Sequence, residues 1–434
     1  MAFFETIGPG TWGDSMRFWL LLGLALCCSS VLADLPETPQ FRQVTVADGL
    51  PSSTLYAVTQ DKKGYLWIAS KDGLARYDGI SYKIYRYSPG DDNSLPGNVV
   101  QALHVDKQDR LWIAIEGQGI SRLNAERTNF THFRKSTHPE IGSDDIWSMT
   151  STADGSLWFG TYAGGLHRMD ARGNIKRFMP GKNIDDVLPS DTILSLTVDK
   201  KDRLWIGTTK GLCFWDGKKF TAIDPQELPD VFVTQLMSDE DGSVWVGTNK
   251  GLVHLSAQGV AIDEGLLLEK AITGLWQDQQ GAIWFSDGAH VFQWQDQRLL
   301  SYTPDLQTPA KIYGVFEDHE GGFWFPTEDR GLLRLPAGWR NFSVFRHQSQ
   351  QNNSISGEVV LGASEADIAH AWLITKTGLD KVNLDSGQVE TVFPDTTKWA
   401  SQLRSVLQTR DGAVWLGHGK GLTRFDATTR ALKH

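Results

Sequence analysis

Cysteine is scarce in this sequence, and the positions of the cysteines exclude a disulfide framework. The chain of 434 residues has three of them. Cys27 and Cys28 lie in an apolar segment near the N-terminus, which leaves Cys213 alone in the remainder. One cysteine cannot form an internal disulfide. We therefore expect a fold stabilised by packing, with Cys213 as a core residue.

A surplus of positive charge is also missing. The chain has 42 Lys and Arg against 52 Asp and Glu, a formal net charge of −10, and its isoelectric point is about 5.6. Proteins that bind nucleic acids neutralise phosphates with clustered Lys and Arg. We therefore predict no nucleic-acid partner.

The apolar run from Phe18 to Cys28 is too short for a membrane span. It has eleven residues, whereas a spanning helix needs about 20. Arg17 precedes the run, and Val31-Leu32-Ala33 follows it as a small-residue cleavage site. This order is typical of a signal peptide. We predict a signal peptide over residues 1–33 and a periplasmic mature chain; an uncleaved anchor is the alternative.

Tryptophan and glycine are abundant, with 17 and 43 residues. Both recur in one motif, Asp-x-x-Gly-x-Leu-Trp-Ile-Gly-Thr, followed by Gly-Leu and a turn. Nine tryptophans mark its copies: Trp67, Trp112, Trp158, Trp205, Trp245, Trp284, Trp324, Trp372 and Trp415. Neighbouring anchors are 39 to 48 residues apart, which is too regular for chance and too long for one hairpin.

The first copy predicts a four-stranded antiparallel meander. Residues 54–60 alternate as a strand, and residues 65–70, 74–77 and 82–87 provide three more, separated by glycine turns. Asp78-Gly79 is a typical hairpin turn. Such a meander cannot bury both faces alone, and a repeat of this length with a Trp is typical of a β-propeller blade. We predict an all-β propeller with nine repeats.

Most propellers have four to eight blades, so nine copies predict one closed ring and the start of another. We assign residues 34–346 to a first propeller of seven repeats and residues 347–434 to two repeats of a truncated second one. The alternative is a single ring of nine blades. In that ring the strand 41–46 would complete the last blade, because the sequence stops at His434 before a fourth strand.

Three segments of the first copy, at 48–52, 61–70 and 73–79, resemble the two-component regulator propeller family. Its repeat reads D-G-x-L-W-I-G-T-x-x-G-L-x-R-Y-D, and the resemblance covers about residues 41–430. Copy six departs from it at residues 287–290. Copy eight lacks the turn glycine before Trp372, which puts its first hairpin in doubt.

The resemblance implies the extracytoplasmic ligand-sensing region of a bacterial transmembrane signalling protein. The parent would be a histidine kinase or a GGDEF-type diguanylate cyclase in the inner membrane, and the effector is not in this chain. The chain itself is then no enzyme, its membrane link is a missing C-terminal segment, and a homodimer is one option for the full-length receptor. The alternatives are a free-standing exported binding scaffold and a streptogramin-lyase-like propeller enzyme.

No catalytic, metal-ligating or cofactor-binding residues are identified from the sequence. The Asp of each Asp-x-x-Gly turn is expected to cap the turn, since one carboxylate per turn is too few for calcium. Propellers bind ligands where loops converge at the channel.

The loops after the Trp strands, together with one unusually large inner-strand residue, supply the candidate ligand-binding residues. Trp147 stands in a first-strand position where we expect other copies to carry Tyr56, Leu103, Leu194 and Thr234. The expected ligand is small and polar, such as a carbohydrate. The candidates are Lys71, Glu116, Trp147, Tyr162, Lys210, Lys250, Glu328 and Arg330.

Overall fold

The computed structural model describes residues 39–433, except 125, 182–187, 225, 229–231, 263–268, 296, 303, 305–309, 342–343, 348–353, 385, 394–402 and 428. The predicted signal peptide and much of the predicted boundary after residue 346 lie outside the described residues. The chain divides into a unit spanning Pro39–Trp339 and a unit that includes Arg340–His434. The regular elements of the described residues are strands and two short 3-10 helices, η1 (Val46–Asp48) and η2 (Trp339–Asn341). The all-β prediction is confirmed.

The unit Pro39–Trp339 contains seven antiparallel sheets, which largely follow the sequence repeats. The first four sheets, each in chain order, are β2 (Leu55–Gln60), β3 (Leu66–Ser70), β4 (Gly73–Tyr77), β5 (Tyr82–Tyr85); β6 (Val100–Val105), β7 (Leu111–Ile115), β8 (Gly119–Leu123), β9 (Phe130–Phe133); β10 (Ile146–Ser151), β11 (Leu157–Thr161), β12 (Leu166–Met169), β13 (Ile175–Phe178); and β14 (Ile193–Val198), β15 (Leu204–Thr208), β16 (Gly211–Trp215), β17 (Phe220–Ala222).

The fifth sheet has three strands among the described residues, and the seventh takes one strand from the N-terminus. These last three sheets are β18 (Val233–Ser238), β19 (Val244–Thr248), β20 (Gly251–Leu255); β21 (Gly274–Gln277), β22 (Ile283–Ser286), β23 (Val291–Gln295), β24 (Arg298–Tyr302); and β25 (Phe316–Glu317), β26 (Phe323–Pro326), β27 (Leu332–Leu335), β1 (Arg42–Val44).

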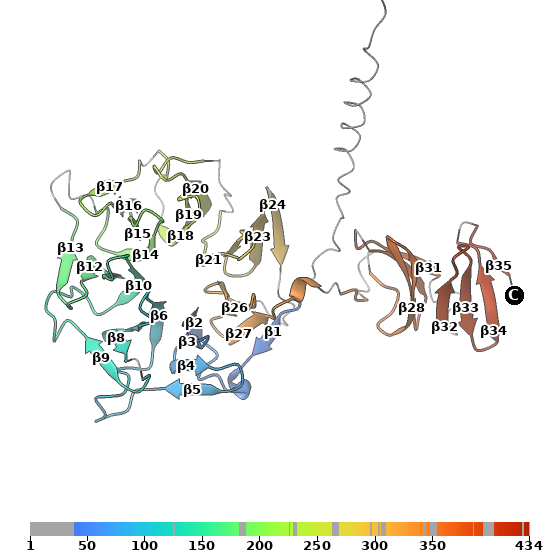
Figure 1. The fold of residues 1–434 in the computed structure, drawn as a ribbon, viewed down its shortest axis with the longest axis horizontal. Helices are drawn as coiled ribbons and strands as arrows, with labels where there is room; N and C mark the ends of the chain where they lie inside the picture. The colour runs from blue at the N-terminus through green and yellow to red at the C-terminus, as the bar shows by residue number, and fades with distance from the viewer. Residues whose placement is uncertain are drawn as a thin grey trace, which may run out of the picture. The chain divides into compact units, whose positions relative to one another are not determined.

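The seven sheets form a ring that the N-terminal strand closes (Figure 1). β1 pairs antiparallel with β27, with Arg42 opposite Arg334 and Val44 opposite Leu332. The first strand of the chain thus completes the seventh repeat, whereas the nine-bladed alternative required it to complete the ninth. The arrangement is compatible with the predicted seven-repeat ring.

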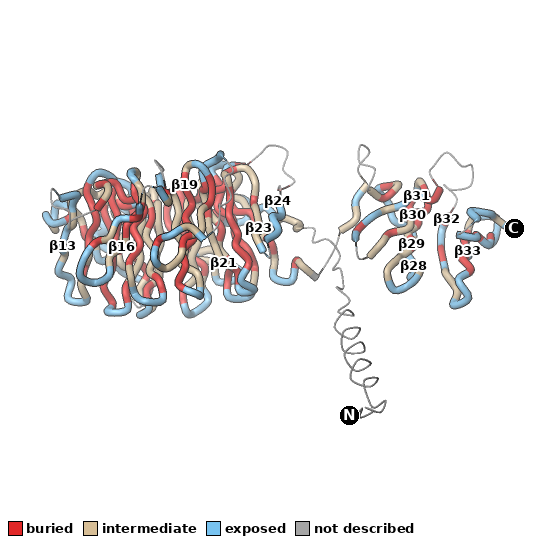
Figure 2. Tube along the Cα trace, turned by 90° about the horizontal axis from the view of Figure 1, so that it is seen from above, coloured by how far each residue is buried: buried red, intermediate tan, exposed pale blue. Residues whose placement is uncertain are grey.

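The motif tryptophans lie between neighbouring sheets. Trp67, for example, is fully buried in one cluster with Leu74 of its own sheet and Leu111 and Ile113 of the next. Figure 2 shows buried residues along the strands throughout this unit. Each sheet therefore covers an apolar face of the next, which explains why the repeat must be iterated.

A hydrogen bond fixes each of these tryptophans to the turn that precedes it. In the first repeat the indole Nε1 of Trp67 donates to Asp61 at 2.9 Å, and the other oxygen of Asp61 accepts from the backbone N–H of Lys63 and Tyr65. Asp106, Asp199, Asp278 and Asp318 repeat this pattern. The predicted turn-capping role of these aspartates is therefore confirmed.

The unit after Trp339 contains two further sheets that pack on one another. They are β28 (Val360–Asp367), β29 (His370–Thr375), β30 (Leu379–Asn383), β31 (Val389–Phe393); and β32 (Leu403–Gln408), β33 (Val414–His418), β34 (Gly421–Phe425), β35 (Leu432–Lys433).

These two sheets correct one expectation and bear out another. The ninth repeat does have a fourth strand, the two-residue β35, which pairs with β34. The glycine-free hairpin of copy eight is irregular, as expected: its pairing register shifts between Glu365 and Asp367, next to the turn. The turn is held by the carboxylate of Asp367, which accepts the N–H of Ala369 and binds the ring of His370. Trp372 is buried, whereas Trp415 is 38% exposed.

Candidate functional site

The two ends of the ring differ in what they present. Leu55 pairs with Ser70, so the innermost strand β2 starts beside the loop that follows the Trp strand. Gln60 pairs with Leu66, so the Asp-x-x-Gly turn lies at the opposite end. We call these ends the loop side and the turn side, and the same register holds in the other repeats.

Five innermost strands carry a β-bulge at their loop-side start. The pairing register shifts across one residue there, which is Tyr56, Gln101, Trp147, Leu194 and Thr234 in β2, β6, β10, β14 and β18. A bulge leaves one residue unpaired and re-aims its side chain. The fold thus places a variable residue of each repeat at the entrance of the channel.

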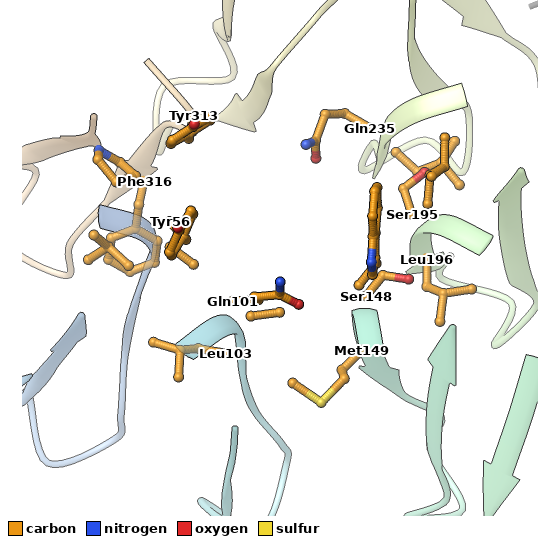
Figure 3. Close-up of a pocket in the computed structure, with 18 of the residues that line it drawn as sticks. Tyr56, Gln101, Leu103, Ser148, Met149, Ser195, Leu196, Gln235, Tyr313 and Phe316 are labelled. Atoms are coloured by element: carbon orange, nitrogen blue, oxygen red, sulfur yellow. The ribbon is translucent and has the colours of Figure 1, made fainter. Parts of the chain in front are cut away.

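A cavity of about 300 Å³ lies between these strands. Its lining comes from β2, β6, β10, β14 and β18, from residues 313–316, and from Pro326, and includes no charged side chain of the described residues. Figure 3 shows the amides of Gln101 and Gln235 pointing into the opening from opposite sides, with Tyr56 and Tyr313 together at a third. The cavity therefore suits an uncharged polar group.

Two polar atoms of the lining have no hydrogen-bond partner. They are the side-chain oxygen of Gln101 and the hydroxyl of Ser148, both buried from solvent. Their neighbours are satisfied, because Ser195 donates to the carbonyl of Val233 and Gln235 to that of Thr273. Buried polar atoms in native proteins are almost always paired. The two unpaired atoms therefore offer binding capacity to a ligand.

Two aromatic pairs stand at the loop-side entrance. Trp147 stacks on Tyr162 with ring centroids 5.8 Å apart and planes 24° apart, and both side chains are about half exposed. Tyr56 and Tyr313 form the second pair at 5.7 Å. Exposed aromatic faces of this kind can stack on flat apolar faces of a ligand.

Burial, together with nearby acidic side chains, keeps the tyrosine pair protonated. Burial is the main cause that raises the pKa of Tyr56, and the charges of Glu116 and Glu328 add to it. Burial also raises the pKa of Tyr313, whose hydroxyl bonds Glu328. Glu328 is held in turn by Lys311 at 3.2 Å. Both phenols are therefore neutral hydrogen-bonding groups at physiological pH.

The structure brings some of the predicted ligand-binding residues together and separates others. Trp147 and Tyr162 stack, and Glu116 and Glu328 lie near enough to Tyr56 to shift its pKa. Of the eight candidates, Trp147 alone lines the cavity. Lys71, Lys210 and Lys250 are exposed on the loops, and Arg330 lies 3.8 Å from Asp329.

The sequence alignment misplaced one inner-strand residue and missed others. It matched Leu103 to Trp147, but the bulge residue of β6 is Gln101, and Leu103 pairs regularly with Ile113. Ser148 and Tyr313 were missed as well. A polar residue at the bulge, such as Gln101, or directly after it, such as Ser148, was the available signal for a cavity-lining residue. It could be recognised only once the position of the bulge was known.

Two histidines of the ring are neutral: His104 on the innermost strand β6 is half-buried, and His167 on the third strand β12 is fully buried. His104 contacts the hydroxyl of Ser151 at 3.0 Å, and the N–H of Gly142 donates to His167. Burial lowers the pKa of each to about 4. No group of three or more His, Cys, Asp or Glu side chains with metal-binding geometry occurs in the part of the chain that the structure describes. These histidines pack the ring.

Comparisons with known proteins agree with the fold. The family model described as "Two component regulator propeller" matches residues 49–72, 94–117, 140–163, 187–210 and 227–250. A protein named histidine kinase P4 from Formosa agariphila is 44% identical over 55 residues, which is 13% of this chain and 4% of that protein.

Solved structures extend this likeness over most of the chain. The extracellular domain of a putative hybrid two-component system from B. thetaiotaomicron matches 91% of this chain and 54% of its own length, with a TM-score of 0.74 and 21% identity. A second such domain from that organism gives 0.57 and 20%. This chain thus spans about half of their length. A streptogramin B lyase matches 68% of this chain and 97% of its own, at 0.55 and 17%.

Proposed function

The repeats of this chain belong to the two-component regulator propeller family, and from that premise we propose that the chain is the extracytoplasmic ligand-sensing region of a bacterial transmembrane signalling protein. The cavity with its unpaired Gln101 oxygen and Ser148 hydroxyl carries the ligand-binding part of this proposal. The histidine-kinase relative supports a kinase as the output of the parent protein. Among the described residues, no helix is both long and apolar enough to cross a bilayer.

The ligand that fits the loop side is small, polar and uncharged, such as a carbohydrate unit. Hydroxyls of a sugar ring can satisfy the unpaired oxygens of Gln101 and Ser148. The apolar face of such a ring can stack on Trp147, which the pairing with Tyr162 holds in place. Absence of charge in the lining disfavours an ionic ligand, because a desolvated charge needs a partner.

Binding of neutral mono- to tetrasaccharides to the purified chain, measured by calorimetry, tests the proposal. We expect Trp147→Ala to weaken binding at least tenfold, because it removes the stacking face and loosens Tyr162. Phe232→Ala is the matched control, since Phe232 is a similarly exposed aromatic that does not line the cavity. Failure of every saccharide to bind, or equal loss in both variants, would count against the loop-side site.

The gene itself tests the receptor part of the proposal. A reading frame that continues past codon 434 into a membrane helix and a kinase or cyclase would support it and name the output. A stop codon there would favour the free-standing exported scaffold instead. The assignment of no catalytic activity to this chain is part of the same proposal.

A further inference from the structure

The turn side of the ring carries two adjoining hollows that the loop-side site does not use. One encloses about 530 Å³ and is lined by the turn-side ends of β6, β10, β14 and β18. The other encloses about 600 Å³ and is lined by the turns after β18, β21 and β25. They share Asp239, Glu240 and Gln277, so they form one continuous depression across the turn side.

The two hollows differ in charge. The first holds the exposed side chains of Lys107 and Lys200 beside the hydroxyl-bearing Thr150 and Thr197. It also holds His104, and its one unshared carboxylate, Asp199, is paired with Arg203 at 2.6 Å. The second holds no lysine or arginine among its described lining residues and has acidic side chains such as Glu240 and Glu317. Lys200 and Glu240 lie 3.9 Å apart, with both side chains mostly exposed. The depression thus has a basic end and an acidic end.

Asp239 departs from the other turn aspartates at the shared wall. In five of the turns that precede a Trp strand, one carboxylate oxygen accepts the N–H groups two and four residues on. In the fifth repeat Asp241 accepts the N–H of Ser243 instead. The corresponding oxygen of Asp239 accepts the backbone N–H of Glu240, and it also accepts the side-chain amide of Gln277 at 2.9 Å. The extra acid in the sequence Asp239-Glu240-Asp241-Gly242 therefore leaves Asp239 bonded to Gln277 and Trp245 at the wall that the two hollows share.

Trp276 completes the acidic end. Its ring packs edge-on against Phe316 at 5.0 Å, and its buried indole N–H has no hydrogen-bond partner. It lines the same hollow as Glu240 and Glu317. An aromatic face beside carboxylates is a chemical match for an ammonium group, through cation–π attraction and charge. Lysines beside hydroxyls are a match for a carboxylate.

We propose that the turn side of the ring binds a short zwitterionic peptide, with its carboxylate terminus at Lys107 and Lys200 and its ammonium terminus at Asp239, Glu240 and Trp276. A free amino acid is too short for this, because its two charges lie on one carbon. An extended peptide adds about 3.3 to 3.6 Å per residue and can place its termini in separate hollows. The site lies at the end of the channel opposite the proposed carbohydrate site.

Calorimetry on the purified full chain tests the proposal with triglycine and pentaglycine as probes. Each probe is used free, N-acetylated and C-amidated, so that one terminal charge is removed at a time. At least one free peptide should bind. Either N-acetylation or C-amidation should lower the affinity for that peptide at least tenfold. Added salt should weaken it further, because the lysines are exposed. If neither free peptide shows saturable binding, or capped and free forms bind alike, the proposal is wrong.

Substitutions in the two hollows test which hollow binds which terminus of the peptide. Lys107→Ala with Lys200→Ala should reduce the free peptide to the affinity of its amide and leave the amide unchanged. Glu240→Gln should weaken the amide but not the acetylated form. Lys218→Ala with Lys219→Ala is the matched control, because these lysines lie on a turn-side hairpin outside both hollows. Trp147→Ala should not affect peptide binding, which separates this test from that of the loop side. An equal loss in the Lys218/Lys219 control would overturn the assignment.

Discussion

At the scale of single residues, the partly buried His104 and the buried His167 make the stability of the ring depend on pH. Burial is the main cause that lowers the pKa of both His104 and His167, to about 4, from an ordinary value of 6.5. Between these values the unfolded chain binds protons that the folded chain does not. The stability is therefore fully present above pH 6.5 and is lost as the pH falls toward 4.

We expect the free energy of unfolding to fall by up to about 3 kcal/mol per histidine across this window. Urea unfolding at pH 7 and pH 4.5 measures the change; the lower limit avoids carboxylates such as Asp154, whose pKa is about 2 in the folded chain. His104→Gln should remove part of the pH dependence. His319→Gln, at an exposed turn position, should behave as the wild type. An unchanged slope in His104→Gln would contradict the prediction.

Residue-level prediction from the sequence succeeded where a motif repeats and failed where the backbone deviates. The capping aspartates could be predicted because Asp, Gly and Trp recur at constant spacing. Gln101 could not, because a bulge inserts one residue without a sequence signal, and counting by alternation then selects Leu103. The Trp147 and Tyr162 contact joins two elements, and only the folded sheet shows that their rings meet.

At the scale of elements, the glycine that opens third strands such as β8 and β16 has two separable roles. Gly119 has φ of 73° and Gly211 has φ of 103°, both in the region that disfavours side chains. A Cβ on Gly119 would lie 2.3 Å from the carbonyl oxygen of Phe133, whereas a Cβ on Gly211 would meet nothing within 4 Å. The first position thus combines conformational strain with a close approach of backbone.

Alanine at the two positions should therefore destabilise the ring unequally. Gly211→Ala should lower the free energy of unfolding by about 1 to 2 kcal/mol, the usual penalty for a left-handed conformation. Gly119→Ala should lower it by at least about 1 kcal/mol more, because the backbone of β9 must move. Urea unfolding of both variants provides the comparison, and each serves as the control of the other. Equal losses of unfolding free energy in the two variants would contradict the prediction, because the close approach of the Cβ to the carbonyl oxygen of Phe133 would then have no cost.

Strand boundaries followed closely from the repeat, but strand partners did not. Residues 54–60, 65–70, 74–77 and 82–87 were predicted as strands, and β2 to β5 lie within one residue of these ranges at most ends. The partner of β1 was left open, because alternation shows which faces of a strand are buried and not which strand lies beside it. Its pairing with β27 joins positions nearly 300 residues apart, a separation about which local patterns carry no information.

At the scale of the whole molecule, the two units differ in how well their sheets cover each other. In Pro39–Trp339 each sheet has a neighbour on both sides, and the motif tryptophans are at most 5% exposed. The unit with Arg340–His434 has two sheets, and its outer apolar side chains remain exposed: Leu407 by 58%, Trp415 by 38% and Leu422 by 67%. Local opening requires least free energy where few apolar contacts must be broken.

Proteolysis of the native chain should therefore begin in the second unit. We expect thermolysin to cleave within residues 340–434 first and to leave a fragment close to residues 39–339, because β1 must separate from β27 before the ring can open. Mass spectrometry of a time course identifies the fragments, and the urea-unfolded chain, which should be cut in both units alike, is the control. Early cleavage within the strands of the first unit, at the rate seen for the second, would mean that ring closure gives no local protection. Resistance of both units would mean that two sheets suffice for a stable core, contrary to the expectation from their exposed faces.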